Sequence, residues 1–577
     1  MNKISQLSLK KFVIKYYIFF TITLLIGYIY IPIILKAGII NDDWSIYELT
    51  LLKYSYSELM KSWFIGSHYT RPVALALIGS IGFIFEQKLW LYHLFNSSTW
   101  IISILIFGYI LKKLLNNKVY IIFIILGLNP IFSSSNIFSP AEQLQGTFSN
   151  FLSSISFLFM YFYVTKKSKI KLIASYIFIF FALLCYETAI VFLPMLIFLK
   201  NKFELNLQNI IKYNIKKILA IFLPLLIFIF LIFFYQYFMK NFLDFFKLLD
   251  SNNDIFKYQL FESDFIHQLI KYSFKPITLI THDIFEIYLN SIKFLLRDKL
   301  NLIFLLFLSC LIFYAFIIDS KSNKDDYLNN LNYFDFIFLI IISYFLVMMI
   351  HIAGTALPTL SGYANRGLCS FSIIFAMFIS ISFNKILDNN KLKNIKILLI
   401  TTISFLIFLH TNSFIVHRDN YLNSTIIQND ILNKLSKLHE KHTIKKNSSI
   451  VFANIPTYSK EDFNKEIIFS SEVHDWPRAI YHKSNKIINS ERIFKDKYCK
   501  NILTFEDNIF RGMRPSRSRK INKKVEYNFF SKYPRSVNLK NIKYVYIYTY
   551  EDKDNYNLEK INIDQIQIKL KEIFNCI

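Results

Sequence analysis

Residues 16 to 35 read YYIFFTITLLIGYIYIPIIL, a run without a charged side chain that follows Lys3, Lys10, Lys11 and Lys15. A helix of about 20 apolar residues is long enough to cross the hydrocarbon core of a bilayer. Basic residues gather on the cytoplasmic side of such spans, and no small-residue cleavage site closes this run. We therefore predict a retained signal-anchor span with a cytoplasmic N-terminus.

The rest of the 577-residue chain has the same character, with 54% hydrophobic residues, 18% charged residues and a mean hydropathy of +0.36. Soluble proteins carry roughly a quarter charged residues. This composition excludes soluble globular, disordered, collagen-like and disulfide-scaffold proteins. Much of the formal charge of +26 comes from lysines in short loops between apolar runs, so we interpret it as an orientation signal rather than as a nucleic-acid surface.

Lysine-rich and lysine-poor loops alternate along the chain, which predicts the side of the membrane that each loop faces. Lysine-rich loops follow the apolar runs 90–111, 148–164 and 187–199, and we expect these loops in the cytoplasm. Two short runs, 170–185 and 187–199, meet at Tyr186 and Glu187. Later spans are predicted at 218–238, 302–319, 335–357, 368–384 and 395–411.

These runs predict an α-helical polytopic membrane protein of about eleven spans over residues 1–411, followed by a small soluble α/β domain at 412–577. The tail has mixed polar and charged composition, one helix-period segment and short β-like runs. An odd number of spans places it outside the cytoplasm, as a periplasmic domain of a bacterial inner-membrane protein. Segment 276–296 is interpreted as an amphipathic surface helix, and one more span there would reverse the side of the tail.

The first external loop, 36–89, carries the adjacent acids Asp42 and Asp43 directly after the first span. Carboxylates beside apolar walls can have raised pKa values and act as general bases. The alternative is a solvated loop that ends a helix. The same loop contains His68 and Arg71-Pro72, where an arginine at the start of a membrane-surface helix can present its guanidinium to a phosphate or act as an interfacial anchor.

A resemblance to a known family rests on the order of these features. An N-terminal span, paired acids in the first external loop, Arg71-Pro72 before an apolar helix, and the entrance Tyr92-His93-Leu94-Phe95-Asn96 to the next span resemble the membrane glycosyltransferases of the GT-C superfamily. That superfamily includes protein O-mannosyltransferases and the aminoarabinose transferases of lipid A. The similarity continues through Asn129-Pro130, the loop 133–147 and the short pair of spans, and covers residues 10 to 200.

The resemblance implies inverting transfer of a sugar from a polyprenyl-phosphate donor to an extracytoplasmic glycan, lipid or protein. Asp42 or Asp43 would be the base that deprotonates the acceptor hydroxyl, and the choice between them stays open. Glu142 would provide the second acidic site, although Glu142-Gln143 replaces the usual aspartate. Some members use a divalent metal, so the metal requirement is also open. Glu187 is expected in the same cavity.

The leaving lipid phosphate needs cations near the membrane surface. Arg366 is the first choice, because it stands between two apolar runs where a lone arginine is costly, and Arg71 and His68 are second choices. The alternative for Arg366 is a side chain that snorkels to the head groups.

Two other classes of membrane protein remain as alternatives. A transporter or flippase of lipid-linked glycans would use intramembrane charges as a pathway, and a polysaccharide polymerase or ligase would gather arginine and histidine in one late external loop. The chain has no phosphate-binding G-x4-G-K-[ST] or G-x-G-x-x-G motif. We expect a polyprenyl-phosphate sugar, an external acceptor and membrane lipids as partners, and no nucleic acid. The sugar, the acceptor and the oligomeric state are left open.

Overall fold

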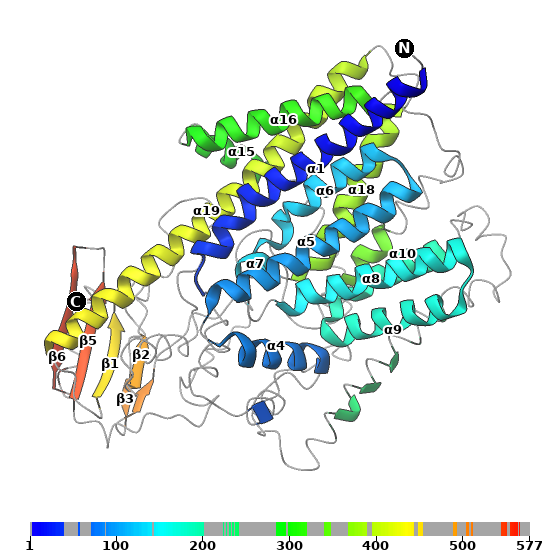
Figure 1. The fold of residues 1–577 in the computed structure, drawn as a ribbon. Coiled ribbons are helices and arrows are strands. Elements are labelled where there is room, and N and C mark those ends of the chain that lie inside the picture. The colour runs from blue at the N-terminus through cyan, green and yellow to red at the C-terminus, as the bar shows by residue number, and fades with distance from the viewer. Residues whose placement is uncertain are drawn as a thin grey trace, which may run out of the picture.

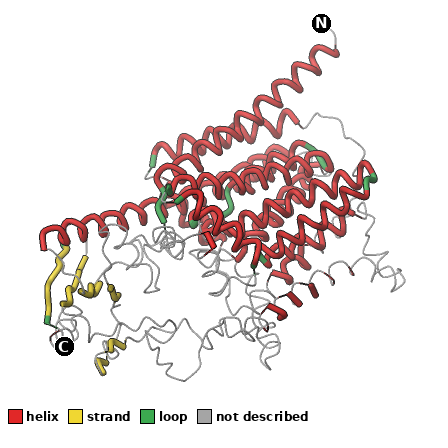
Figure 2. The backbone as a smooth tube through the Cα atoms, turned by 60° about the horizontal axis from the view of Figure 1, so that its bottom comes forward, coloured by secondary structure: helices red, strands yellow, loops and turns green. Residues whose placement is uncertain are grey.

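Long helices lie side by side in a bundle in the computed structural model, and one of them extends from the bundle to a small β-sheet (Figures 1 and 2). The structure describes residues 3–39, 56–57, 71–86, 88–140, 144–200, 284–295, 298–319, 340–347, 367–388, 395–442, 448–453, 489–492, 504–506, 509–511, 544–550 and 554–562, together with single positions between 223 and 241 and residue 565.

Six helices in this described part are long and apolar enough to cross a membrane. They cover Tyr16–Lys36, Leu89–Leu114, Asn117–Phe138, Leu144–Lys166, Cys369–Leu387 and Lys396–Ile431. The prediction of a helical membrane protein is confirmed at this level.

Helix α6 (Asn117–Leu128) lies at the centre and packs against α5 (Leu89–Leu114) and α18 (Cys369–Asp388). The Asn116 side chain caps α6 by accepting a hydrogen bond from the Val119 amide at 3.0 Å. The helix stops directly before Asn129-Pro130, as predicted, because proline lacks the amide that would continue the ladder. Every residue in the apolar window of this segment is buried, so α6 is the core of the bundle.

Helices α8 (Leu144–Lys166) and α9 (Lys169–Cys185) form a closely packed hairpin. Helix α9 ends because Tyr186 takes an extended backbone with φ −154° and ψ 126°. The chain then turns through the 3-10 helix η3 (Glu187–Val191) into α10 (Phe192–Lys200). The two short runs therefore meet at Tyr186 and Glu187, where the sequence placed their junction.

The remaining helices surround this centre. Helix α15 corresponds to the described part of the predicted amphipathic segment, and it buries Ile287 and Ser291. The bounds are α1 (Lys3–Lys36), α4 (Pro72–Phe85), η2 (Ile131–Ser133), α7 (Ser134–Phe138), α15 (Ile284–Leu295) and α16 (Lys299–Asp319).

Helix α19 (Lys396–His442) joins the bundle to the sheet without a break. The predicted domain boundary between 411 and 412 falls inside this helix, and Asn412, Phe414 and Tyr421 beyond it are buried. Beyond the bundle, the Lys434 ammonium lies 4.2 Å from the ring centroid of Tyr556 on β6. The change in composition at 412 therefore does not coincide with a structural break.

The sheet has the strand order β2-β1-β5-β6, with β1 parallel to β2 and β5, and β6 antiparallel to β5. A separate antiparallel pair consists of β3 and β4. The strands are β1 (Ser448–Ala453), β2 (Asn489–Arg492), β3 (Thr504–Glu506), β4 (Ile509–Arg511), β5 (Tyr544–Tyr550) and β6 (Tyr556–Ile561).

Candidate functional site

Two of the predicted site residues, Arg71 and Glu187, are described by the structure. The other five lie outside the described residues, so their predicted roles stay predictions: Asp42, Asp43, His68, Glu142 and Arg366.

Arg71 and Glu187 are 116 positions apart in sequence and form an ion pair. The Arg71 Nε donates to both carboxylate oxygens of Glu187 at 2.9 Å, and Nη2 lies 2.9 Å from Oε2. The Arg71 Nη1 donates to Gln145 Oε1 at 3.1 Å. A planar guanidinium suits this forked contact, because it presents several N–H donors in a fixed geometry.

Local structure brings these three side chains together. Arg71 directly precedes α4, Gln145 is in the first turn of α8, and Glu187 opens η3. The extended backbone at Tyr186 brings its ring to 4.7 Å from the Arg71 guanidinium carbon. The side chains of Arg71 and Glu187 are 20% and 15% exposed, so the pair is partly shielded from solvent but accessible.

Gly38 lies just after α1 and is held by three hydrogen bonds. Its amide donates to Thr425 Oγ1 at 3.2 Å, and its carbonyl accepts from Tyr421 at 2.8 Å and from His93 Nε2 at 2.9 Å. A carbonyl only accepts, so Nε2 carries the proton, and a neutral His93 ring leaves Nδ1 as an acceptor. That buried Nδ1 has no partner among the described residues.

The anchor at Gly38 matters because the chain leads from it to Asp42. Asp42 is four positions after Gly38, which an extended chain covers in at most about 14 Å. Gly38 itself is fixed by its hydrogen bonds to α5 and α19.

Asn96, one helical turn after His93, cross-links three elements inside the bundle. Its amide nitrogen donates to the carbonyls of Asn136 and Ile137 at 2.7 and 3.2 Å, and its oxygen accepts from Thr147 at 2.5 Å. Away from water such groups need protein partners. The pattern Tyr92 to Asn96 predicts the entrance of a span, but only the tertiary structure shows which groups Asn96 bonds.

A second buried chain of polar contacts continues toward η3. Ser370 donates to Asn150 Oδ1 at 2.7 Å and is 3.2 Å from the Thr188 hydroxyl. Helices α8 and α18 are thus connected to the residue that follows Glu187. We call the part of the bundle defined by Gly38, Arg71, Asn96, Gln145 and Glu187 the polar end.

Comparison with protein-family models finds no match, and comparison with curated proteins finds none either. The resemblance to GT-C glycosyltransferases therefore enters below only as a proposal.

A second charged centre, which the sequence interpretation missed, joins α1, α16 and α19. Arg418 Nε donates to Asp419 at 2.7 Å, and Arg418 Nη1 donates to the Tyr28 carbonyl at 2.7 Å. The Asn301 amide donates to Asp298 at 2.8 Å and to Asp419 at 3.4 Å. The signal was His417-Arg418-Asp419, which the predicted boundary at 412 had assigned to a soluble domain.

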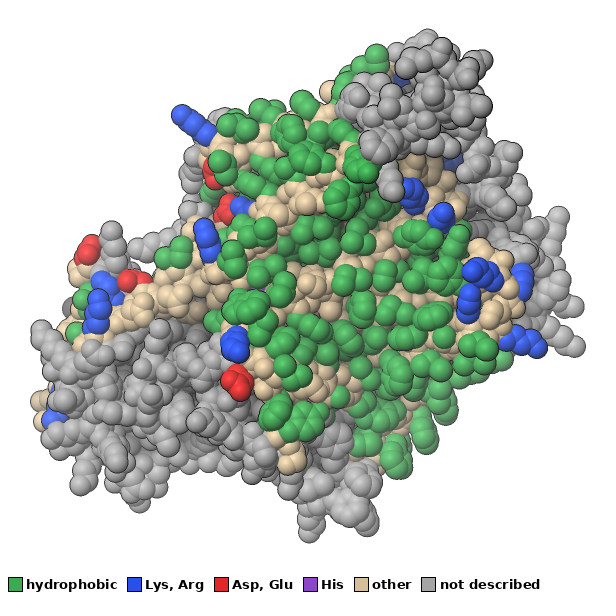
Figure 3. Space-filling model, viewed as in Figure 1, with side chains coloured by type: hydrophobic (Ala, Val, Ile, Leu, Met, Phe, Trp, Pro, Cys, Tyr) green, Lys and Arg blue, Asp and Glu red, His purple; other side chains and the backbone are tan. Residues whose placement is uncertain are grey.

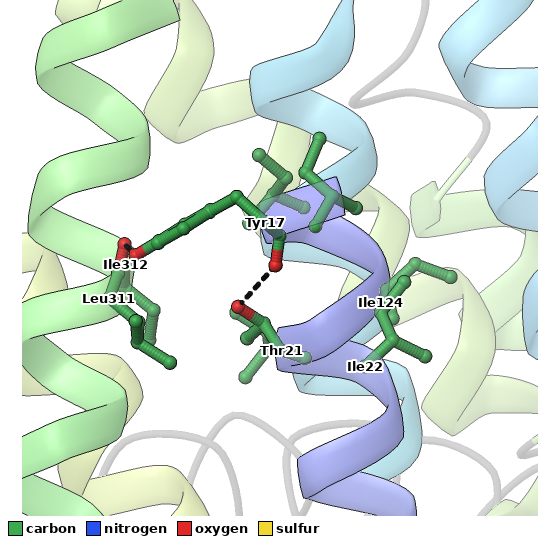
Figure 4. Close-up of a pocket in the computed structure, with 9 residues that line it drawn as sticks. Tyr17, Thr21, Ile22, Ile124, Leu311 and Ile312 are labelled. Carbon is green, nitrogen blue, oxygen red and sulfur yellow. Dashed lines mark hydrogen bonds between the residues drawn. The ribbon is translucent and has the colours of Figure 1, made fainter. Parts of the chain in front are cut away.

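A small cavity lies between α1, α6 and α16. It holds about 10 Å³, which is room for no more than about one water molecule. Figure 4 shows its lining, where the Thr21 hydroxyl donates to the Tyr17 carbonyl at 3.0 Å. The Tyr17 hydroxyl crosses to α16 and contacts the Leu311 carbonyl. These contacts join two helices.

No group of three or more histidine, cysteine, aspartate or glutamate side chains that could hold a metal ion occurs in the described part of the chain. The paired acids and Glu142 lie outside that part, so the metal requirement stays open.

Proposed function

We propose that this protein is a membrane glycosyltransferase of the GT-C type. It transfers a sugar from a polyprenyl-phosphate donor to a glycan, lipid or protein outside the cytoplasm. In this proposal the chain crosses the membrane about eleven times, and the segment 412–577 carries an external α/β domain.

The observation that carries the proposal is the polar end of the bundle. There the forked Arg71–Glu187 pair is partly exposed and lies at the same end as Gly38, from which the chain continues to the paired acids. Charged side chains are costly within a membrane and are retained there mainly for function. A cation at the end of the bundle where the chain enters the loop with two carboxylates supports a site for a phosphate leaving group and a hydroxyl nucleophile.

The proposed reaction uses these groups in one displacement. Asp42 or Asp43 takes the proton of the acceptor hydroxyl, and the oxygen attacks the anomeric carbon as the bond to the lipid phosphate breaks. The configuration inverts, and polyprenyl phosphate leaves with the bonding electrons. Arg71 stabilises the developing negative charge, with His68 and Arg366 as further donors.

Glu187 is a positioning residue in this proposal. Its carboxylate holds the guanidinium of Arg71 in one orientation, together with Gln145. Preorganised donors stabilise a transition state better than mobile ones, because they need not reorient during the reaction. Glu142 is assigned to the acceptor side.

The test follows sugar transfer by the purified full-length protein. Wild type, Asp42→Asn and Asp43→Asn are given a panel of radiolabelled polyprenyl-phosphate sugars, with a membrane extract as acceptor. We expect one of the two variants to lose at least about 100-fold in transfer rate while it still binds donor, because a general base contributes about that much or more. Glu286→Gln, an exposed acid on α15, is the matched control and should transfer normally.

A further variant tests the proposed interaction of Arg71 with the donor phosphate. Arg71→Lys keeps the positive charge but loses the fork that contacts Glu187 and Gln145, so we expect about tenfold lower kcat/KM for the donor.

A wild type that binds lipid-linked sugars and never transfers them would contradict the enzyme proposal and favour the transporter. Full activity in both aspartate variants would contradict the assigned base.

A further inference from the structure

A groove about 340 Å³ in volume runs between α5 and α8. Every side chain that lines it is aliphatic or aromatic, and Ile102 and Tyr109 on its wall are 43% and 42% exposed. The lining consists of Ile102, Leu105, Ile106, Tyr109, Leu158 and Phe162. In a membrane-spanning helix, such an open apolar surface faces lipid chains.

Lysines lie directly over the two aromatic rings of this groove. The Lys113 ammonium is 5.7 Å from the centroid of Tyr109, and those of Lys166 and Lys171 are 5.9 and 5.0 Å from the centroid of Phe162. Three helices contribute them: Lys113 is in the last turn of α5, Lys166 ends α8 and Lys171 belongs to the first turn of α9. We call Lys113, Lys166 and Lys171 the lysine end of the groove.

No acidic residue accompanies these lysines in the sequence stretches 101–120 and 155–175. Figure 3 shows lysine and arginine side chains gathered along the right edge, beside a broad hydrophobic face. Along α5 the lysine end is about 25 Å from the polar end, since Asn96 and Lys113 are 17 positions apart at 1.5 Å rise per residue.

We propose that this groove is a binding site for an anionic phospholipid. One acyl chain lies in the groove between α5 and α8, and the phosphate accepts hydrogen bonds from the lysine end. Lipid tails are as apolar as the groove, so the tail alone gives little preference for one lipid. The preference comes from the three ammonium groups, which attract a negatively charged head group. This site is separate from the proposed catalytic site and does not depend on the proposed reaction.

Native mass spectrometry of the full-length protein in detergent tests the site. The protein is titrated with phosphatidylglycerol or with phosphatidylcholine of the same acyl chains. We expect wild type to retain phosphatidylglycerol at least about tenfold more tightly, because each lysine near an anionic head group favours binding. Equal retention of the two lipids would overturn the proposal.

Two variants distinguish binding by these three lysines from nonspecific attraction to the positive charge of the protein. The triple variant Lys113→Gln, Lys166→Gln and Lys171→Gln should lose the preference. The control triple variant Lys88→Gln, Lys293→Gln and Lys299→Gln removes the same charge from exposed positions at the opposite end of α5 and on α15 and α16, and should keep it. An equal loss in both triple variants would show nonspecific attraction and overturn the proposal.

A third variant tests the groove without changing charge. Ile106→Trp fills the space between α5 and α8, so it should lower retention of phosphatidylglycerol although all three lysines remain. Unchanged retention in a folded Ile106→Trp protein would show that no acyl chain lies in the groove.

Discussion

At the scale of single residues, Gly38 shows how neighbouring helices can fix one backbone position. A Cβ atom added there would lie 2.6 Å from Thr425 Cγ2, closer than real Cβ contacts come. Both backbone polar groups of Gly38 are also bonded, to Thr425 and to Tyr421 and His93. Glycine is needed here because α19 approaches the chain closely, and not because of its own dihedral angles.

The Gly38→Ala variant should therefore unfold at a lower temperature. The added methyl group must displace Thr425, and overpacking of this kind costs about 1–3 kcal/mol. The second-site change Thr425→Ser removes Cγ2 and keeps the hydroxyl that accepts from the Gly38 amide. Thermal unfolding of the purified protein should show most of the loss in Gly38→Ala restored in the double variant. No restoration would mean that the contact with Thr425 does not limit this position.

Arg71 and Glu187 could each be predicted as a candidate site residue from the sequence, but their pairing could not. Both were selected from the sequence, Arg71 for its place before an apolar helix and Glu187 for its place between two short spans. Their pairing was not predicted, because it depends on α4 packing near the end of α9. No periodicity within either segment encodes that contact.

At the scale of elements, α5 and α6 approach each other closely because each presents a glycine to an isoleucine of the other. A Cβ on Gly108 of α5 would lie 2.6 Å from Ile124, and a Cβ on Gly127 of α6 would lie 2.9 Å from Ile104. The Trp100 indole also donates to the Gly127 carbonyl at 2.9 Å. Small residues allow membrane helices to approach closely, and this contact holds the central helix in place.

We expect Gly127→Ala to destabilise the protein by about 1–3 kcal/mol, because Ile104 presents three side-chain carbons to the new methyl group. Gly27→Ala on α1 is the matched control, since its Cβ would meet only Ile31 at 3.9 Å. Thermal unfolding should show a lower midpoint for Gly127→Ala and an unchanged or higher one for Gly27→Ala. The same midpoint in both variants would argue against close α5–α6 packing.

Helix α19 shows why a change in composition need not coincide with the end of a helix. It contains many polar residues after 411, and composition alone favours a soluble segment from 412 onward. Several of these polar side chains are buried and bonded to other elements: Asn412 donates to the Ser291 carbonyl at 2.9 Å, and Arg418 Nη1 donates to the Tyr28 carbonyl at 2.7 Å. Their polarity is satisfied by neighbouring helices rather than by water.

At the scale of the whole molecule, the alternation of lysine-rich loops predicts an orientation. The lysine end should face the cytoplasm, and the sheet beyond α19 should lie outside. A fusion of alkaline phosphatase after His442 should be active, and a fusion after Lys167 should be inactive, because the phosphatase folds only outside the cytoplasm. Fusions of green fluorescent protein at the same positions should give the opposite pattern. Active phosphatase after Lys167 would reverse the predicted orientation.

The sequence by itself determined the helical membrane class, the ends of α6 at Asn129-Pro130 and of α9 at Tyr186, and the choice of Arg71 and Glu187 as candidates. These are local properties, set by runs of apolar residues and by where a helix can continue. Only the tertiary structure decided that these two side chains pair, that α19 continues through 412, and that Arg418 and Asp419 join α19 to α1 and α16. Such contacts depend on which helix faces lie together, because a buried polar group is stable only where another segment supplies its partner.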